Sequence, residues 1–452
     1  FPYTTLFRSH NFQNFRGARL SHGETRALPF LVPMSLLLTL AFVVFLLAMV
    51  GLKYWLAFRQ IRHVTAHANA VPEQFADRVS LDAHRRAAAY TVERTRLGLF
   101  ETAAGALVLV AATLLGGLDW IVARLASLGT GDFALQMLVV TVVLLAVSAL
   151  DLPFSWYRQF RIEQKFGFNR MTPGLWIADL AKSLLLTALL GLPLLAAVLW
   201  LMGSAGDLWW VHAWMLWVAF NALVLVLYPT LIAPLFNKFE PLKDGRLAER
   251  ITALLARTGF SSKGVFVMDG SRRSAHGNAY FTGLGRAKRI VFFDTLVERL
   301  QPSEIEAVLA HELGHFKLKH IAKRLAYSFV ASLAFLALLG WLITQPWFYT
   351  GLGVTPSLTG SNHGVALVLF ALVLPVFTFV FAPVASLLSR RHEFEADAFA
   401  ARHASAGDLV NALVKLYQDN ASTLTPDPLH SAFYDSHPPA SIRIQRLAQQ
   451  AA

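Results

Sequence analysis

Cysteine is absent from this 452-residue sequence, and charged residues make up only 15% of it. Without cysteine the chain has no disulfide framework and no thiolate metal site, so any metal ligands must be His, Asp or Glu. Hydrophobic residues reach 55%, and this excess, together with the shortage of charge, argues against an ordinary soluble domain. The composition therefore predicts an α-helical polytopic membrane protein.

The positive net charge of +12 does not indicate nucleic-acid binding. The basic residues lie in loops beside long apolar runs, where membrane topology and anionic lipid explain them. No nucleic-acid recognition module is visible in the sequence. We therefore expect a lipid bilayer, and no nucleic acid, among the partners of this chain.

Seven apolar runs approach or exceed the roughly 20 residues that a membrane-spanning helix needs. They lie at about Leu31–Phe58, Leu97–Leu118, Phe133–Leu152, Leu175–Met202, Leu208–Phe236, Ile321–Ile343 and Val365–Leu388. We expect residues 34–236 to form an N-terminal membrane domain with five of these spans. Residues 237–452, including spans 321–343 and 365–388, form the second domain. Residues 1–33 are expected to be an artefact or a disordered tail.

Charge bias between the connecting segments predicts the orientation in the membrane. Arg and Lys are frequent in Arg59–Arg96, Pro153–Pro173 and Asn237–His320, whereas the alternate links hold almost none. By the positive-inside rule the basic segments and the C-terminus are cytoplasmic. We expect a multi-pass protein of the cell inner membrane.

The sequence His311-Glu312-Leu313-Gly314-His315 lies in a segment, Ser303 to His320, with helical periodicity. Residues four apart share a helix face, so His311 and His315 can bind one Zn²⁺, while Glu312 can accept a proton from water. Ser303 and Glu306 predict a capping box at its start. The alternative is a chance match on an amphipathic helix, because two histidines do not complete a catalytic zinc site.

A third ligand follows the seventh span, in another segment of helical character. Glu393 can complete the zinc site, and Asp397, one turn later, can accept a hydrogen bond from the distal nitrogen of a ligating histidine. Alternatively, Glu393 belongs to a surface charge cluster. His392 and Glu395 are expected to point away from the site into solvent.

The segment before the metal helix predicts a small α+β unit. A helix is expected at Gly245–Thr258, and strands at Gly264–Met268, Ala279–Thr282 and Arg289–Phe293, with a turn at Gly283-Leu284-Gly285 between the last two strands. The metal helix then continues into the sixth span without a linker. The zinc site is therefore expected at the membrane face.

Four sequence motifs, which occur in the same order as in the family, resemble the CAAX prenyl protease 1 (Ste24-type) branch of the M48 metallopeptidases. They are His311–His315, the segment Ser389–Asp397, the strand Asn278–Phe281 and the element Ser436–Pro439. The run Phe160–Asn169 is also similar to the N-terminal domain of that branch. The resemblance implies seven transmembrane helices that form a barrel around a chamber, with a cytoplasmic gluzincin-type α+β zinc protease domain.

The resemblance also implies roles for single residues. His311, His315 and Glu393 would bind one Zn²⁺ per chain, Glu312 would be the catalytic base, and His437 would donate to the oxyanion. The substrate would lie along Asn278, Ala279 and Tyr280, and Arg443 would brace His437 or the substrate. Without the resemblance, Asn278 reads as a turn residue and His437 as a loop histidine.

The expected function is that of an integral-membrane zinc metalloendopeptidase that cuts peptide bonds at the cytoplasmic membrane face. Family members remove the C-terminal tripeptide of prenylated proteins, and the substrate is accordingly a peptide or protein, prenylated or inserted in the membrane. An HtpX-like quality-control protease is one alternative, which seven spans disfavour. A non-catalytic membrane chamber or scaffold is another, which an intact Glu312 disfavours.

Overall fold

The computed structural model describes residues 32–282 and 289–451. The predicted turn Gly283-Leu284-Gly285 and residues 1–31 of the predicted tail lie outside the described residues. The elements discussed below all belong to the unit Met34–Ala452.

Seven long helices in the described part of the chain are apolar enough to cross a membrane, and this confirms the number of spans that the sequence predicts. Several continue beyond their apolar runs, because polar residues also extend a helix where they pack on another domain. The spans are built from α1 (Met34–His67), α2 (Leu81–Ala112), α4 (Asp132–Tyr157), α5 (Pro173–Ser204), α6 (Trp209–Leu227), α11 (His320–Leu342) and the pair α13 (His363–Thr378) and α14 (Ala382–His403).

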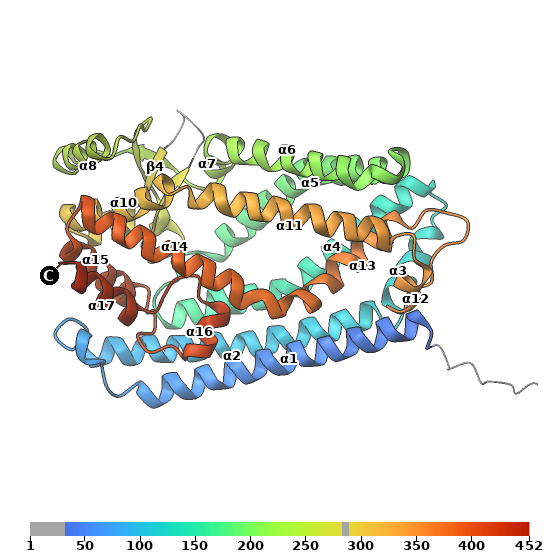
Figure 1. Ribbon diagram of the computed structural model, residues 1–452, viewed down its shortest axis with the longest axis horizontal. Helices are drawn as coiled ribbons and strands as arrows, with labels where there is room; N and C mark the ends of the chain where they lie inside the picture. Colours follow the sequence, from blue (N-terminus) through green and yellow to red (C-terminus); the bar gives the residue numbers. More distant parts are fainter. Residues whose placement is uncertain (1–31, 283–288, 452) are drawn as a thin grey trace, which may run out of the picture. The chain divides into compact units, whose positions relative to one another are not determined.

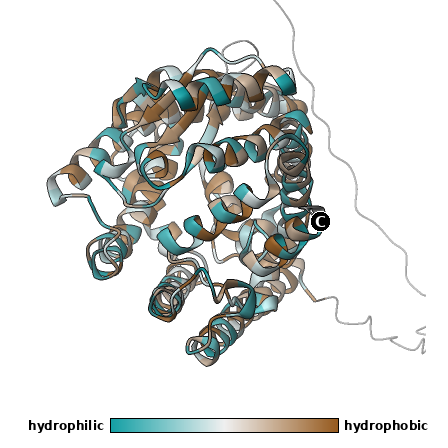
Figure 2. Cartoon of the chain, turned by 90° about the vertical axis from the view of Figure 1, so that its left-hand side faces the viewer, coloured by the Kyte–Doolittle hydropathy of each residue, from teal (hydrophilic) through white to brown (hydrophobic). Residues whose placement is uncertain are grey.

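Figure 1 shows these helices running lengthwise, with the strands and the short helices of the second domain gathered at one end. At the other end lie α3 (Gly117–Ala126) and α12 (Pro346–Thr350). Figure 2 looks at the end that carries the second domain, where hydrophilic residues are frequent on the helices. One apolar cluster joins the membrane helices, and a separate one forms the core of the second domain.

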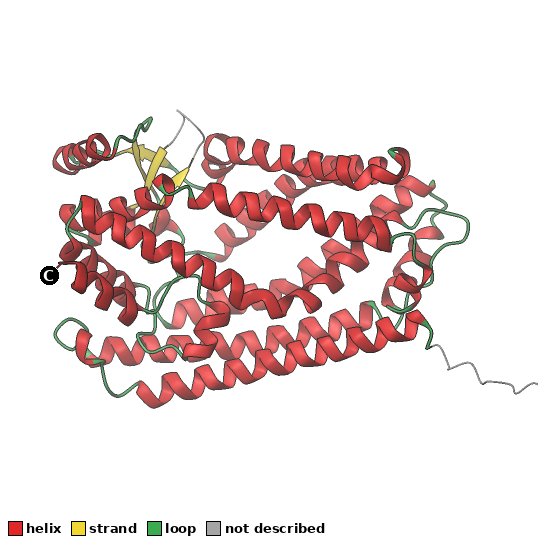
Figure 3. Ribbon diagram, viewed as in Figure 1, coloured by secondary structure: helices red, strands yellow, loops and turns green. Residues whose placement is uncertain are grey.

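The second domain contains a four-stranded sheet beside the helices (Figure 3). Its strands are β1 (Phe239–Pro241), β2 (Val265–Met268), β3 (Ala279–Thr282) and β4 (Arg289–Phe293), in the order β1-β2-β4-β3. β2 and β4 are parallel, and the outer pairs are antiparallel. The sequence did not predict β1, which is three residues long and ends at a proline. β3 is an edge strand, so one side of its backbone is available to another extended chain.

Five further helices complete the second domain around the metal helix α10 (Pro302–Lys317). They are α8 (Gly245–Thr258), α9 (Asp294–Arg299), α15 (Ala406–Asp419), α16 (Pro428–Tyr434) and α17 (Ala440–Ala451). Ile305, Leu309 and Leu313 lie on one stripe of α10 and are almost fully buried in the apolar core. Burial of this stripe fixes the rotation of α10, and with it the direction in which its histidines point.

The predicted capping box at the start of α10 is wrong in position. Gln301 is the N-cap, and its backbone N–H donates to the Glu304 carboxylate at 2.7 Å. Glu306 instead accepts hydrogen bonds from Arg250 and Arg257 of α8. Pro302 explains the shift, because proline is favoured at the first helical position and leaves the preceding residue as the cap.

The metal helix also does not continue directly into the sixth span. α10 ends at Lys317, Lys319 adopts a left-handed conformation with φ of 58°, and α11 begins at His320. A non-glycine residue in this region marks a constrained turn. The turn folds the buried His320 back toward the face of α10 that carries the metal motif.

Candidate functional site

Close packing of α10 against α14 brings the two parts of the metal motif together. A Cβ atom at Gly314 would lie only 3.0 Å from the Cα of Ala396. Glycine at this position therefore lets the two backbones approach more closely than any other residue would. Ala396 is fully buried at the same contact. The approach places Glu393 of α14 beside the histidines of α10.

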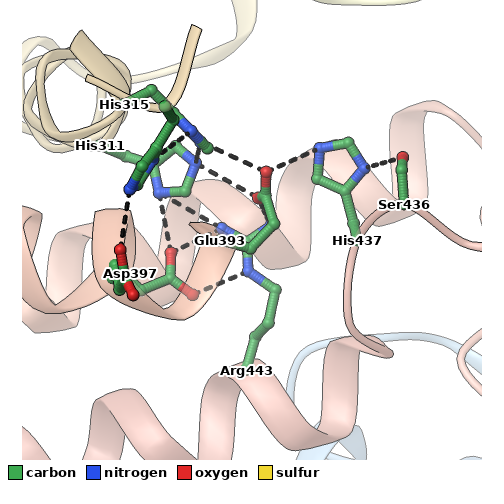
Figure 4. Close-up of polar contacts among 9 residues, drawn as sticks. His311, His315, Glu393, Asp397, Ser436, His437 and Arg443 are labelled. Atoms are coloured by element: carbon green, nitrogen blue, oxygen red, sulfur yellow. Dashed lines mark hydrogen bonds and ion pairs between the residues drawn. The ribbon is translucent and has the colours of Figure 1, made fainter. Parts of the chain in front are cut away.

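Figure 4 shows His311, His315 and Glu393 converging on one point. The two Nε2 atoms are 3.2 Å apart, His315 Nε2 is 3.2 Å from Glu393 Oε1, and His311 Nε2 is 3.5 Å from Glu393 Oε2. Ligands at about 2.1 Å from a tetrahedral zinc ion lie roughly 3.3 to 3.4 Å from each other. The three side chains therefore fit a single divalent cation.

The electrostatics of this cluster also favour a cation. Glu393 Oε2 is buried, and its only contacts among the described residues are long ones, with His311 Nε2 at 3.5 Å and Arg443 Nη1 at 3.7 Å, so it has lone pairs available to a ligand. Burial by itself lowers the pKa of His311, but its hydrogen bonds to Asp397 and Glu393 raise that pKa to about 9. The same two carboxylates that favour a proton on His311 favour a metal ion at Nε2.

Asp397 and Arg443 contact His311 at Nδ1, on the side of the ring away from the cluster. Asp397 Oδ1 lies 2.8 Å from His311 Nδ1, and Arg443 donates to both Asp397 oxygens at 2.6 and 2.9 Å. When Asp397 accepts a hydrogen bond from the Nδ1–H group of His311, the lone pair of the ring is on Nε2 and points at the cluster. The Arg443 guanidinium binds Asp397, and Arg443 also lines the cavity, so the expected contact with His437 or the substrate stays a prediction.

A second carboxylate reaches His315 through another histidine, which the sequence did not predict. His315 Nδ1 and His320 Nδ1 are 3.1 Å apart, and His320 Nε2 donates to Glu395 at 2.9 Å. The His392 ring stacks on that of His320, with centroids 4.1 Å apart. Glu395 and His392 point away from the cluster, as expected, but both contact His320 and are only partly exposed, because the turn at Lys319 brings His320 between them and His315.

Glu312 faces the cavity beside the cluster. No hydrogen bond or ion pair within the described chain occupies its carboxylate, whereas Glu393 and Asp397 are both engaged. Burial raises the pKa of Glu312 above its ordinary value, and the neighbouring histidines partly oppose this shift. A carboxylate that is free and more basic than usual is suited to accept a proton.

A cavity of about 750 Å³ adjoins the cluster and is lined by Glu312, His437, Asn278 and Ala279, among other residues. Asn278 immediately precedes the edge strand β3, and its side-chain oxygen accepts from the Ala279 amide at 2.8 Å. Tyr280 can contribute its backbone to the predicted substrate edge. Its hydroxyl is directed at Met268 Sδ, and its ring packs on Phe293, so only its backbone remains for contact with a peptide.

His437 lies on the loop before α17 and is exposed toward the cavity. Its Nε2 is 3.5 Å from Glu393 Oε1, and its Nδ1 is 3.0 Å from the Ser436 hydroxyl (Figure 4). The fold thus brings a loop histidine more than 120 positions after His311 into the same site. This placement directs Nε2 toward Glu393 at the edge of the cluster.

Comparison with known families agrees with this geometry. Residues 60–238 match a model described as CAAX prenyl protease N-terminal, five membrane helices. Residues 241–451 match the model of peptidase family M48. The second match contains His311, His315 and Glu393 together with the cavity residues Asn278 and His437.

Individual relatives give the same result over most of the chain. A CAAX prenyl protease 1 homolog of rice is 35% identical over 90% of this chain and 96% of its own length. The human homolog is 31% identical over 86% of this chain and 90% of its own. The crystal structure of Ste24p from S. mikatae superimposes with a TM-score of 0.85 at 30% identity, covering 92% of this chain and 99% of that one.

These matches span both the membrane helices and the domain that carries the histidine and glutamate cluster. A peptidase of this family acts on a peptide or protein, and the seven long apolar helices place it in a lipid bilayer. The chain belongs to the CAAX prenyl protease 1 family of M48 metallopeptidases and is a multi-pass membrane metallopeptidase.

Proposed function

We propose that this protein is a zinc endopeptidase that cuts prenylated substrates at the cytoplasmic face of the membrane. The observation that carries the proposal is the convergence of two histidine nitrogens and a carboxylate, 3.2 to 3.5 Å apart, beside a cavity. His311, His315 and Glu393 would hold the metal. Two imidazoles and one carboxylate, with no thiolate, are a donor set found in catalytic zinc sites.

Each residue around the metal has a distinct task in this proposal. When bound, zinc would polarise the substrate carbonyl and acidify water. Glu312 accepts the proton of the attacking water, because its carboxylate is free and its pKa is raised by burial. It then delivers that proton to the leaving amine. Asp397 keeps the His311 ring in the orientation and tautomer that ligation needs.

His437 and the β3 edge act on the substrate. His437 Nε2 donates to the carbonyl oxygen as negative charge develops on it, while Ser436 orients the ring through Nδ1. The backbone of β3 pairs with the substrate as an additional strand, and Asn278 holds the substrate backbone where that strand begins. The scissile bond of an extended substrate would thus lie beside Glu312.

The membrane face and the lipid requirement rest on other evidence. The loops that are rich in Arg and Lys lie on the same side of the spans as the catalytic domain, which favours a cytoplasmic site. The relatives are named CAAX prenyl proteases, and we extend that substrate class to this chain. The site begins within a turn of the sixth span, so a substrate anchored by a lipid would reach it without leaving the membrane.

The decisive experiment is hydrolysis of a farnesylated C-terminal CAAX peptide by the purified full-length protein in detergent. The same peptide without its lipid and the variant Glu312→Ala are the controls, with zinc content measured on every sample. We expect cleavage that requires both the lipid and Glu312, and a Glu312→Ala protein that retains zinc and does not turn over.

Other outcomes separate the alternatives. Cleavage of both peptides, still dependent on Glu312, would favour a general membrane-protein quality-control protease. A fully zinc-loaded protein that cleaves neither peptide would favour a non-catalytic chamber. Residual activity of Glu312→Ala comparable with the wild type would remove the assigned role of that residue.

A further inference from the structure

Arg94 is a cavity-lining cation that the mechanism above does not use. It lies on α2, and it lines the same cavity as Glu312 and Asn278. The cavity contains one other arginine among its described lining residues, Arg443, whose charge is matched by Asp397. In contrast, no carboxylate of the described chain lies within ion-pair distance of the Arg94 guanidinium. A cationic group therefore lines the cavity without a direct ion pair, and the Glu163 carboxylate acts on it only at longer range.

The guanidinium of Arg94 is positioned by an aromatic ring. Its central carbon lies 5.5 Å from the centroid of the Tyr90 ring. Tyr90 is buried, and its hydroxyl donates to Glu163 at 2.5 Å, so the ring is itself fixed. Phe166 and Phe168 pack edge-on against the same ring. Arg94 is thus held over a rigid surface instead of moving freely in solvent.

A guanidinium carries five N–H donors, so the contact of Arg94 with Tyr90 leaves other N–H groups for a ligand. Those groups match the two oxygens of a carboxylate, to which arginine donates two parallel hydrogen bonds. A carboxylate is therefore the ligand chemistry that Arg94 selects. Lysine at the same position would keep the charge and lose the paired geometry.

The dimensions of the cavity indicate which carboxylate this is. A cavity of about 750 Å³ is large enough for a short peptide, and three extended residues span about 10 Å at ~3.3 Å each. Figure 1 shows α2 and α10 apart from each other, and both helices contribute residues to the lining of this cavity. A short C-terminal peptide is therefore a ligand of the size that this cavity admits.

We infer that Arg94 binds the free C-terminal carboxylate of the substrate while the scissile bond lies at the metal cluster. This inference rests on the proposed function, because it concerns the substrate of the same site. It makes Arg94 a determinant of specificity: the enzyme would measure the distance from the chain end to the bond that is cut. Substrates without a free terminus nearby would lose this contact.

The membrane-facing alternative is that Arg94 only contributes positive charge at the bilayer surface. Arg96, two positions along α2, supplies the matched control because it is also exposed but is not one of the described residues that line the cavity. A role in membrane topology or anionic-lipid binding would be shared by both arginines. A role in carboxylate recognition would belong to Arg94 alone.

The test compares two farnesylated CAAX peptides that differ only at the C-terminus, one a free acid and the other an amide. The wild type should cleave the acid about 10- to 100-fold more efficiently in kcat/KM, as expected for a hydrogen-bonded charge pair. Arg94→Gln should lower cleavage of the acid to the level of the amide, mainly through KM, and leave the amide rate nearly unchanged. Arg94→Lys should be intermediate, and Arg96→Gln should match the wild type.

The amide peptide reports whether the variant is folded and loaded with zinc. Equal cleavage of acid and amide by the wild type would overturn the inference while leaving the proposed function intact. So would an Arg94→Gln protein that loses both activities in parallel, or an Arg96→Gln protein that loses the preference to the same degree. Failure of zinc-loaded wild type to cleave either peptide would overturn the proposed function and this inference with it.

Discussion

The site has a buried half and an open half, and the two differ in how their side chains are held. His311, Glu393, Asp397 and Arg443 are 7, 4, 4 and 5% exposed and contact one another. Asn278 and His437 are exposed to the cavity, and Glu312 is half-buried with a free carboxylate. Water competes weakly in the buried half, so its geometry is fixed before any ligand arrives, whereas the open half must exchange its contacts with substrate.

This difference predicts that changes in the buried half act through the metal and changes in the open half act through turnover. Metal content and rate are therefore the two quantities to measure on each variant. The predictions below follow the expected size of the effect.

The largest effect is expected for Glu393→Ala, which removes a ligand from the buried half. Metal affinity should fall sharply, and turnover should fall to background at ordinary zinc concentrations. Elemental analysis of the purified protein and titration with a chelator measure the affinity. A variant with undiminished zinc would show that the third ligand lies elsewhere. It would also contradict the assignment of metal binding to the buried half of the site.

A loss of about 10²- to 10³-fold in kcat is expected for His437→Ala in the open half, the range for removal of one oxyanion donor. Zinc content should not change, and KM should change less than kcat, because the contact strengthens only as charge develops on the carbonyl oxygen. Steady-state kinetics with the farnesylated peptide separate the two constants. A defect confined to KM would assign His437 to substrate binding.

A smaller loss, about 10- to 100-fold in metal affinity or activity, is expected for Asp397→Asn. The amide keeps the shape but removes the charge that favours the ligating form of His311 and balances Arg443. Glu395→Gln is the matched control, because it acts on His315 only through His320 and its side chain is 35% exposed. In a zinc competition assay Glu395→Gln should reduce zinc affinity less than Asp397→Asn does. The reverse order would show that the contact through His320 supports zinc binding more than Asp397 does.

Much of the fold could be predicted because it depends on short-range patterns. Long apolar runs predicted the seven spans, and the ranges of α8, β3 and β4 agree with the prediction to the residue. The errors lie at helix ends and edges: the cap at Gln301, the break at Lys319 and the short strand β1. Each is decided by a few backbone angles and by packing, which hydrophobic periodicity does not encode.

For the site, the sequence alone determined which residues are one helical turn apart. His311 with His315, and Glu393 with Asp397, share faces because four residues make about one turn of a helix. Such spacing needs no knowledge of what packs against either helix. It was sufficient to propose the metal ligands and the carboxylate that supports one of them.

Only the tertiary structure decided which residues from distant segments meet. In the structure Asp397 contacts His311 and not His315, and Arg443 donates to Asp397. His315 instead contacts His320, which donates to Glu395. It also brought Arg94 of a membrane helix to the wall of the cavity. These contacts depend on how closely α10 and α14 approach at Gly314 and on where loops return, and those distances follow from packing of the whole domain, not from any local pattern.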